Sequence, residues 1–139
     1  MDFHARNKFL LMAYNQSELK IMGRIVANSE HRKVGELLPL YREHLTRALS
    51  RTPRYTSNIN VLMHALGYFS QDITTREKGY FLEALERYRA GSIPLSAVSS
   101  IVNSWIVRFD QEYLQQQSFF SPYPEDLAFI SDSGKGRDL

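Results

Sequence analysis

Apolar residues recur at three- and four-residue steps along most of this 139-residue chain, which is the spacing that places side chains on one face of an α-helix. No segment shows the strict alternation of apolar and polar residues that is typical of a half-buried β-strand. The pattern predicts six helices. Four of them span residues 3–14, 17–27, 36–50 and 94–117, and the other two begin at residues 57 and 74. We therefore expect an all-α fold. A single compact bundle, with an extended proline-containing strap at its C-terminal end, should occupy residues 1–130, and a disordered tail should follow at 131–139.

Local signals mark several helix ends. Ser17 is a suitable cap for the second helix, because its hydroxyl can accept a backbone N–H of the first turn. Thr74 followed three residues later by Glu77 matches a capping box, and Gly91 can adopt the left-handed conformation that ends a helix. The apolar faces predict a common core: Leu45, Leu62, Leu66, Leu85, Val102, Trp105 and Phe109.

The chain contains no cysteine, which excludes a disulfide framework, a thiolate zinc site, a cysteine-held iron–sulfur cluster and a thiol nucleophile. It also lacks the glycine-rich loops that bind phosphates in nucleotide-dependent enzymes. None of the four histidines lies three or four residues from another, which disfavours a metal site built on one helix. We expect no catalytic residues, no cofactor and no metal.

The charge of the chain is unevenly distributed. Residues 1–60 carry ten Lys and Arg against five Asp and Glu, whereas residues 61–139 carry seven against ten, so the overall formal charge is only +2. This asymmetry allows a local basic surface for a polyanion, although charged residues more often form an ordinary solvated face. The longest purely apolar run, residues 9–14, is far shorter than the roughly 20 residues of a membrane-spanning helix. We therefore expect a cytoplasmic protein without a membrane segment.

The clearest basic pattern lies in the third predicted helix. His44, Arg47, Arg51 and Arg54 follow steps of three and four residues, which predicts one cationic stripe with Arg42 on its flank. Arginine suits this role because its planar guanidinium donates two parallel hydrogen bonds to a phosphate. The competing interpretation is an exposed helix face on which Glu43 pairs with Arg47. The candidate nucleic-acid contacts are Lys8, Arg24, Arg42, His44, Arg47, Arg51 and Arg54.

Two further pairs of polar residues fall one helical turn apart. Asn60 and His64 share a helix face and either face a ligand or form a buried hydrogen-bonded pair. His4 and Lys8 also share a face, either as a phosphate clamp or as solvated surface. Three tyrosines are candidates either to stack on exposed bases or to pack in the core: Tyr55, Tyr68 and Tyr88.

Several segments, in this order, are similar to a known family. They are HARNKFLLMAYNQ (4–16), GRIVA (23–27), NVLMHALGYF (60–69), EK (77–78), YRAGSIPL (88–95) and YLQQQSFFSPYPEDL (113–127). Together they resemble the YbgA-like family, a bacterial helical domain of unknown function that occurs alone or fused to a desulfidase domain acting on thiouracil or thiouridine. The polar positions within these segments are His4, Lys8, Asn60, His64, Lys78, Tyr88 and Arg89.

The resemblance implies an accessory role beside a desulfidase. A desulfidase domain needs cysteines for its iron–sulfur cluster, and this chain has none, so it resembles the accessory half alone. The leading hypothesis is a non-catalytic module that binds RNA, with tRNA as the first candidate, through phosphate and shape contacts. The alternatives are a protein-interaction or scaffold domain that docks a partner such as a separate desulfidase, and a small enzyme with an unrecognised site.

Overall fold

The computed structural model describes residues 2–121, which are helical apart from turns and connections and contain no strand. The all-α prediction is confirmed. The helices of this region are α1 (Asp2–Arg6), α2 (Lys8–Tyr14), α3 (Gln16–Ala27), α4 (Val34–Ala48), α5 (Tyr55–Leu66), α6 (Thr75–Arg89), α7 (Leu95–Phe109) and α8 (Glu112–Gln115). The prolines of the predicted strap and the predicted tail at 131–139 lie outside the described residues.

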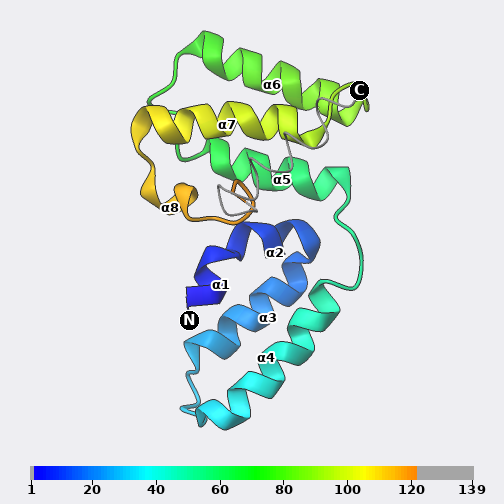
Figure 1. Cartoon of the computed structure of the whole chain (residues 1–139), viewed down its shortest axis with the longest axis vertical. Coiled ribbons are helices and arrows are strands. Elements are labelled where there is room, and N and C mark those ends of the chain that lie inside the picture. Colours follow the sequence, from blue (N-terminus) through cyan, green and yellow to red (C-terminus); the bar gives the residue numbers. More distant parts are fainter. Residues whose placement is uncertain (1, 122–139) are drawn as a thin grey trace, which may run out of the picture.

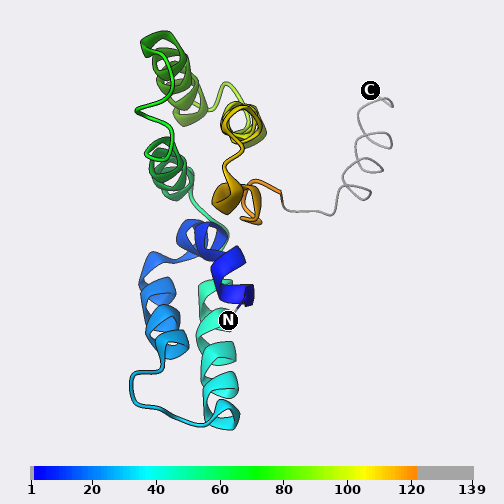
Figure 2. The same ribbon diagram turned by 90° about the vertical axis from the view of Figure 1, so that its left-hand side faces the viewer.

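The helices pack as two groups that meet at α2 (Figure 1). At one end of the molecule, α3 and α4 form an antiparallel hairpin; at the other, α5 packs against both α6 and α7, and α8 turns back from the end of α7. The short helix α2 contacts α3 on one side and α5 on the other, and the view in Figure 2 shows it between the two groups. One connected core of buried apolar side chains extends through both groups.

The helix predicted over residues 3–14 is broken at Asn7 into α1 and α2. In a continuous α-helix the N–H of Phe9 would donate to the carbonyl of Ala5, four residues earlier. Instead, the side-chain amide of Gln117 is hydrogen-bonded to both groups. Its Oε1 accepts from the Phe9 N–H at 3.0 Å, and its Nε2 donates to the Ala5 carbonyl at 2.7 Å. Insertion of a side chain into the helical hydrogen-bond ladder accounts for the break, and we call this arrangement the Gln117 bridge.

Neighbouring groups complete the Gln117 bridge. The Ser118 N–H donates to the Arg6 carbonyl at 2.9 Å, and the Asn7 side-chain amide donates to the Phe3 carbonyl at 2.8 Å. The Ser118 hydroxyl also donates to the side-chain oxygen of Asn7. Gln117 is only 1% exposed, so a buried polar side chain joins the end of the described chain to its beginning.

The helix predicted over residues 94–117 is also shorter than expected, because α7 ends at Phe109. Asp110 adopts the left-handed conformation (φ 50°, ψ 50°), which a short polar residue tolerates better than most. The side chain of Gln111 then accepts two backbone N–H groups from the first turn of α8 and starts a new helix there.

Two further local signals are confirmed and one is wrong, while α4 and α5 each begin two residues earlier than predicted. Thr74 and Glu77 form the predicted capping box, and Gly91 has a positive φ of 81° just beyond α6. The cap of α3 is not Ser17 but Asn15, whose side-chain oxygen accepts a backbone N–H of the first turn at 3.0 Å. The helix begins one residue before Ser17, so the hydroxyl lies inside the first turn rather than at the cap position.

Most of the predicted core is confirmed. Five of the predicted residues are buried: Leu62, Leu66, Leu85, Val102 and Trp105. Leu45 and Phe109 are half-buried and pack against the edge of the core. Helical spacing identified the inward faces of α5, α6 and α7 correctly, while the position of a residue at the edge of the core depends on the neighbouring helices.

Replacing Trp105 with alanine should lower the free energy of unfolding by about 3–5 kcal/mol. The indole lies between Phe69 and Phe81, with ring centroids 5.7 and 5.2 Å away, so truncation leaves a cavity between α5, α6 and α7. Urea unfolding measures the loss. The control is Val107→Ala on the same helix, where Val107 is 82% exposed and the expected change is within about 0.5 kcal/mol. Equal effects of the two substitutions would contradict the packing of α7.

Replacing Gln117 with leucine should also destabilise the protein, by about 1–3 kcal/mol for each backbone group left buried and unpaired. Leucine is close to glutamine in size, so the decrease in the free energy of unfolding measures the contribution of the hydrogen bonds to Phe9 and Ala5. Urea unfolding and amide exchange at Phe9 provide the measurements, and exchange should accelerate. Gln116→Leu is the matched control, because Gln116 is exposed. If both leucine variants unfold alike, the bridge makes no contribution to stability.

Candidate nucleic-acid interface

The division of charge along the sequence coincides with the division of the structure into two groups of helices. Residues 2–54, which form α1 to α4 and the connection after them, carry ten Lys and Arg against five Asp and Glu. Residues 55–121 carry five against six. The excess positive charge therefore belongs to one end of the molecule, and a local basic surface exists despite the small net charge.

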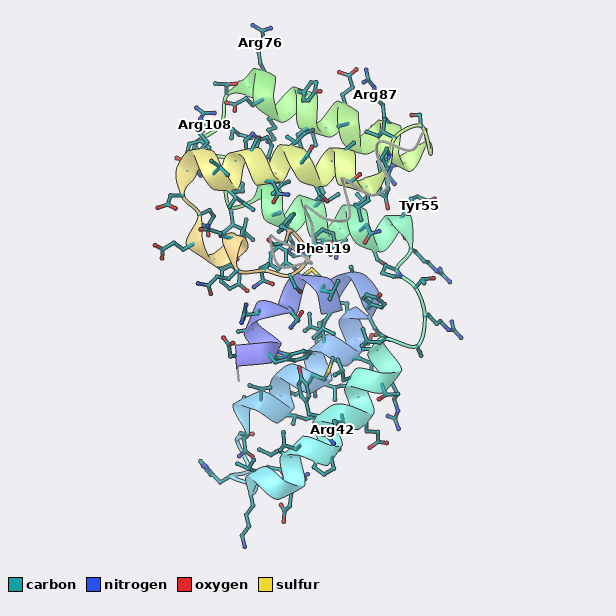
Figure 3. All side chains as sticks on the ribbon, in the orientation of Figure 1. Arg42, Tyr55, Arg76, Arg87, Arg108 and Phe119 are labelled. Atoms are coloured by element: carbon teal, nitrogen blue, oxygen red, sulfur yellow. The ribbon has the colours of Figure 1, made fainter. Side chains whose placement is uncertain are left out.

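An arginine-rich segment, residues 42–54, runs from the middle of α4 to the start of α5. It contains four arginines and a single glutamate. Arg42, Arg51 and Arg54 are exposed, and none of them makes an ion pair within residues 2–121. Figure 3 labels Arg42 on α4, where the segment begins, and Tyr55 at the start of α5, the first residue after the segment. The guanidinium groups of these three arginines are available to bind phosphates.

The predicted stripe does not form as one continuous face. Arg47 is exposed but pairs with Glu43 at 2.6 Å, as the competing interpretation predicted. Residues five apart on a helix are separated by about 140° around its axis, so Arg42 and Arg47 face different directions. Because α4 ends at Ala48, Arg51 lies in the connection rather than on the helix.

His44 must be removed from the candidate phosphate contacts. Its Nδ1 lies 2.6 Å from a carboxylate oxygen of Glu18 on α3, and both side chains are 14% exposed. This face of α4 packs on α3, which spacing along α4 alone could not reveal. The pair joins the two helices of the hairpin, so its role is structural.

His4 and Lys8 do not form a phosphate clamp. The Nδ1 of half-buried His4 is hydrogen-bonded to the hydroxyl of Tyr41 on α4 at 3.0 Å, while Lys8 is exposed. Burial lowers the pKa of His4 below its usual value, and the positive charge of Lys8 lowers it further. Burial also raises the pKa of Tyr41. Both pKa shifts favour the uncharged rings, and the hydrogen bond between them fixes α1 against α4.

Asn60 and His64 do not form the buried pair that was one of the two interpretations. His64 is exposed, Asn60 is half-buried, and no side-chain hydrogen bond joins them in the described structure. Both remain on the side of α5 that is not covered by the core.

The other motif positions lie apart from the arginine-rich segment. Lys78 is exposed on α6, and Arg89 pairs with Glu86 at 3.4 Å on the same helix. The half-buried hydroxyl of Tyr88 accepts a hydrogen bond from the buried amide of Asn58 at 3.0 Å. Tyr88 is thus a packing residue of α6 against α5, not a stacking surface.

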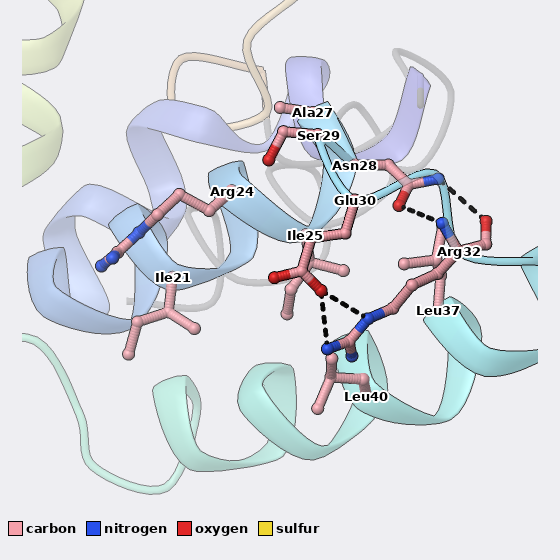
Figure 4. A pocket seen from close by; sticks show the side chains of 10 residues that line it. All are labelled: Ile21, Arg24, Ile25, Ala27, Asn28, Ser29, Glu30, Arg32, Leu37 and Leu40. Carbon is pink, nitrogen blue, oxygen red and sulfur yellow. Dashed lines mark hydrogen bonds and ion pairs between the residues drawn. The ribbon is translucent and has the colours of Figure 1, made fainter.

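Arg24 lies beside an open groove of about 530 Å³ near the loop of the α3–α4 hairpin. The floor is apolar, with Ile25 and Leu40 among its residues, and one wall carries an ion pair of Arg32 with Glu30 at 2.9 Å (Figure 4). The groove and the connection that holds Arg51 are at opposite ends of α4. The structure therefore does not bring Arg24 together with the arginine-rich segment.

Aromatic residues gather where the two groups of helices meet. The rings of Tyr68, after α5, and Tyr113, on α8, are stacked, with centroids 5.8 Å apart and planes at 16°. Phe9 of α2 lies 6.2 Å from each of them and packs against Phe120 at 6.1 Å. Burial raises the pKa of Tyr113, and the neighbouring Tyr68 raises it further. Three of the segments that carry the family resemblance therefore meet at this point, namely residues 4–16, 60–69 and the part of 113–127 that the structure describes.

Sequence reasoning missed Gln117 and Tyr113. Gln117 lies in the last of the segments that carry the resemblance, but nothing in the sequence distinguishes it from the neighbouring Gln115 and Gln116. Nothing local indicated its partners, which are more than a hundred residues away.

The remaining chemistry of the described region is limited. Residues 2–121 contain no group of three or more His, Cys, Asp or Glu side chains that could hold a metal ion. Every fully buried side-chain nitrogen or oxygen in this region has a hydrogen-bond partner. None of its helices is both long and apolar enough to span a membrane.

Comparisons with known proteins agree with the resemblance seen in the sequence. The uncharacterized protein YbgA of Escherichia coli (strain K12) is 27% identical over 125 residues, which cover 89% of this chain and 74% of that protein. No solved structure matches the chain. The model of a family described as a protein of unknown function (DUF1722) matches residues 8–124, which are most of the sequence. This protein therefore belongs to the DUF1722 family, to which the YbgA-like resemblance pointed.

Proposed function

We propose that this protein binds structured RNA, without catalysis, through phosphate contacts made by the arginine-rich segment. The observation that carries the proposal is that Arg42, Arg51 and Arg54 are exposed and make no ion pair with the rest of the described chain. An arginine that is already paired loses that interaction when it binds a phosphate, whereas an unpaired one does not. These three side chains therefore favour binding of a polyanion more than Arg47 does.

The type of contact follows from the same residues. Arginines on a connection between helices can follow a phosphate backbone, but the described helices present no repeated set of side chains that would read a long base sequence. Recognition of double-stranded RNA by shape and backbone suits such a surface. The resemblance to domains fused to thiouridine desulfidases makes a tRNA the first RNA to test.

A protein partner is the second candidate, because three apolar side chains are exposed along one side of α4, in the same row as Arg42. Val34, Leu38 and Leu49 are 68%, 44% and 46% exposed, and their spacing places them along one side of the helix. A surface of this kind suits docking of another protein, such as a separate desulfidase. Measuring binding at several salt concentrations distinguishes the two candidates. The affinity for RNA falls steeply as the salt concentration rises, whereas the affinity of an apolar interface depends much less on salt.

The double substitution Arg51→Gln and Arg54→Gln should weaken tRNA binding at least about tenfold, because it removes two phosphate contacts. The slope of log affinity against log salt concentration should become shallower by about two ion equivalents, because fewer counterions are released. Fluorescence anisotropy with labelled tRNA over a range of salt concentrations measures both quantities.

The matched control removes the same number of charges elsewhere. Arg76 and Lys78 on α6 are exposed and make no ion pair within residues 2–121, and Figure 3 shows Arg76 directed away from the molecule. Arg76→Gln with Lys78→Gln should leave affinity and slope close to those of the wild-type protein. If the two double variants behave alike while both retain the wild-type circular dichroism spectrum, the assignment of binding to the arginine-rich segment is wrong. Salt-insensitive binding of a protein partner, together with no binding of tRNA, would favour the apolar side of α4 instead.

A further inference from the structure

Tyr68 and Tyr113 form an exposed aromatic surface. They are 42% and 38% exposed, and their rings are nearly parallel, with centroids 5.8 Å apart. This distance falls within the range of about 4.5–7 Å that is usual for offset stacking. Neither hydroxyl makes a hydrogen bond within the described residues, so no polar contact explains why these rings lie together. Among the aromatic pairs of residues 2–121, this is the only stacked one.

The two rings rest on a rigid support. Phe9 packs against both from the core side and is itself only 3% exposed. The backbone N–H of Phe9 is held by Gln117, so the Gln117 bridge positions the residue on which the tyrosines rest. A surface that is already ordered loses little conformational freedom when a flat ligand stacks on it.

The groups around the tyrosine pair suit a nucleobase. The side chain of Gln116, one helical turn after Tyr113, is exposed and makes no hydrogen bond within the described region, so it can donate to and accept from a base edge. Lys8, which precedes Phe9 in the chain, is exposed and makes no ion pair within residues 2–121. Glu112 is also exposed next to Tyr113, so charge alone does not favour a polyanion at this place.

We propose that the Tyr68–Tyr113 pair is a stacking platform for an unpaired nucleotide of the bound RNA. The inference rests on the proposed function and makes it more specific: the ligand is a structured RNA with at least one base outside its helices. Every base has an aromatic face, so stacking on tyrosine is tolerant of sequence and complements phosphate contacts made elsewhere. Other exposed tyrosines do not offer such a platform. Tyr80 is 63% exposed but stacks on no other ring in the described structure.

The test compares two RNA probes, a hairpin with an unpaired uridine loop and the blunt duplex formed by the same stem. Tyr68→Leu and Tyr113→Leu should each weaken binding of the hairpin at least about fivefold and leave binding of the duplex unchanged. The salt slope should not change, because stacking releases no counterions. The phenylalanine variants at both positions keep the ring and should bind like the wild-type protein. Tyr80→Leu is the matched control for loss of an exposed tyrosine and should have no effect.

A second measurement needs no variant and is decisive if a leucine variant fails to fold. The hairpin is prepared with 5-iodouridine in its loop and crosslinked by light to the wild-type protein, and mass spectrometry then identifies the modified residue. Adducts on Tyr68 or Tyr113 support the platform, whereas adducts elsewhere overturn it. Equal losses for hairpin and duplex, or no loss for either, also overturn it while leaving the role of the arginine-rich segment intact. If the wild-type protein binds neither probe and no tRNA, the proposed function itself is wrong, and the platform with it.

Discussion

The rest of the structure depends on one amide side chain. Gln117 supplies the hydrogen bonds that a continuous first helix would have made between Phe9 and Ala5, and so allows the chain to turn at Asn7. That turn lets α2 pack on α3 and α5 at once while α1 remains beside α4. Without the Gln117 amide, the Phe9 N–H and the Ala5 carbonyl would be buried and unpaired, at a larger cost in folding free energy than most single contacts contribute. The break in the first helix is therefore stable only because the amide fills it. The Gln117 bridge is therefore the condition under which the two groups of helices meet in one core.

The meeting of these groups separates two kinds of surface. The first four helices and the connection after them, which include the arginine-rich segment, carry the excess of basic residues, and the part of the described chain from α5 onward is close to neutral. Where the groups touch, the surface is aromatic rather than charged. The arginine–glutamate pairs within single helices, such as that of Arg87 with Glu83, are exposed and contribute little to stability. Apolar packing around Trp105 and the buried hydrogen bonds contribute more to stability than the surface charges do.

Local patterns predicted what depends on local physics. The spacing of apolar residues identified the inward faces of α5 to α7, and the capping box at Thr74 identified the start of α6, because both effects operate within one or two helical turns. His44 was assigned to an exposed stripe, since nothing along α4 shows that this face packs against Glu18 of α3. Gln117 was missed for a related reason: its two partners are distant in the sequence, and three consecutive glutamines look alike until the fold buries one of them. For the candidate site, the basic character of the N-terminal half was predictable, but which arginines are unpaired was not.

The hydrogen bond between Gln117 and Phe9 also determines which part of the fold can form last. The α3–α4 hairpin is built from contacts between neighbouring parts of the chain, which close small loops and form quickly. The bridge spans 108 residues, so its loop closes at a larger entropic cost, and on the ribosome it must wait until nearly all of the described chain has been made. A nascent chain would thus display the arginine-rich segment before the tyrosine pair has its support. Under the proposed function, such a chain would attract polyanions electrostatically first, and it would gain the base-stacking platform only when the described fold is complete.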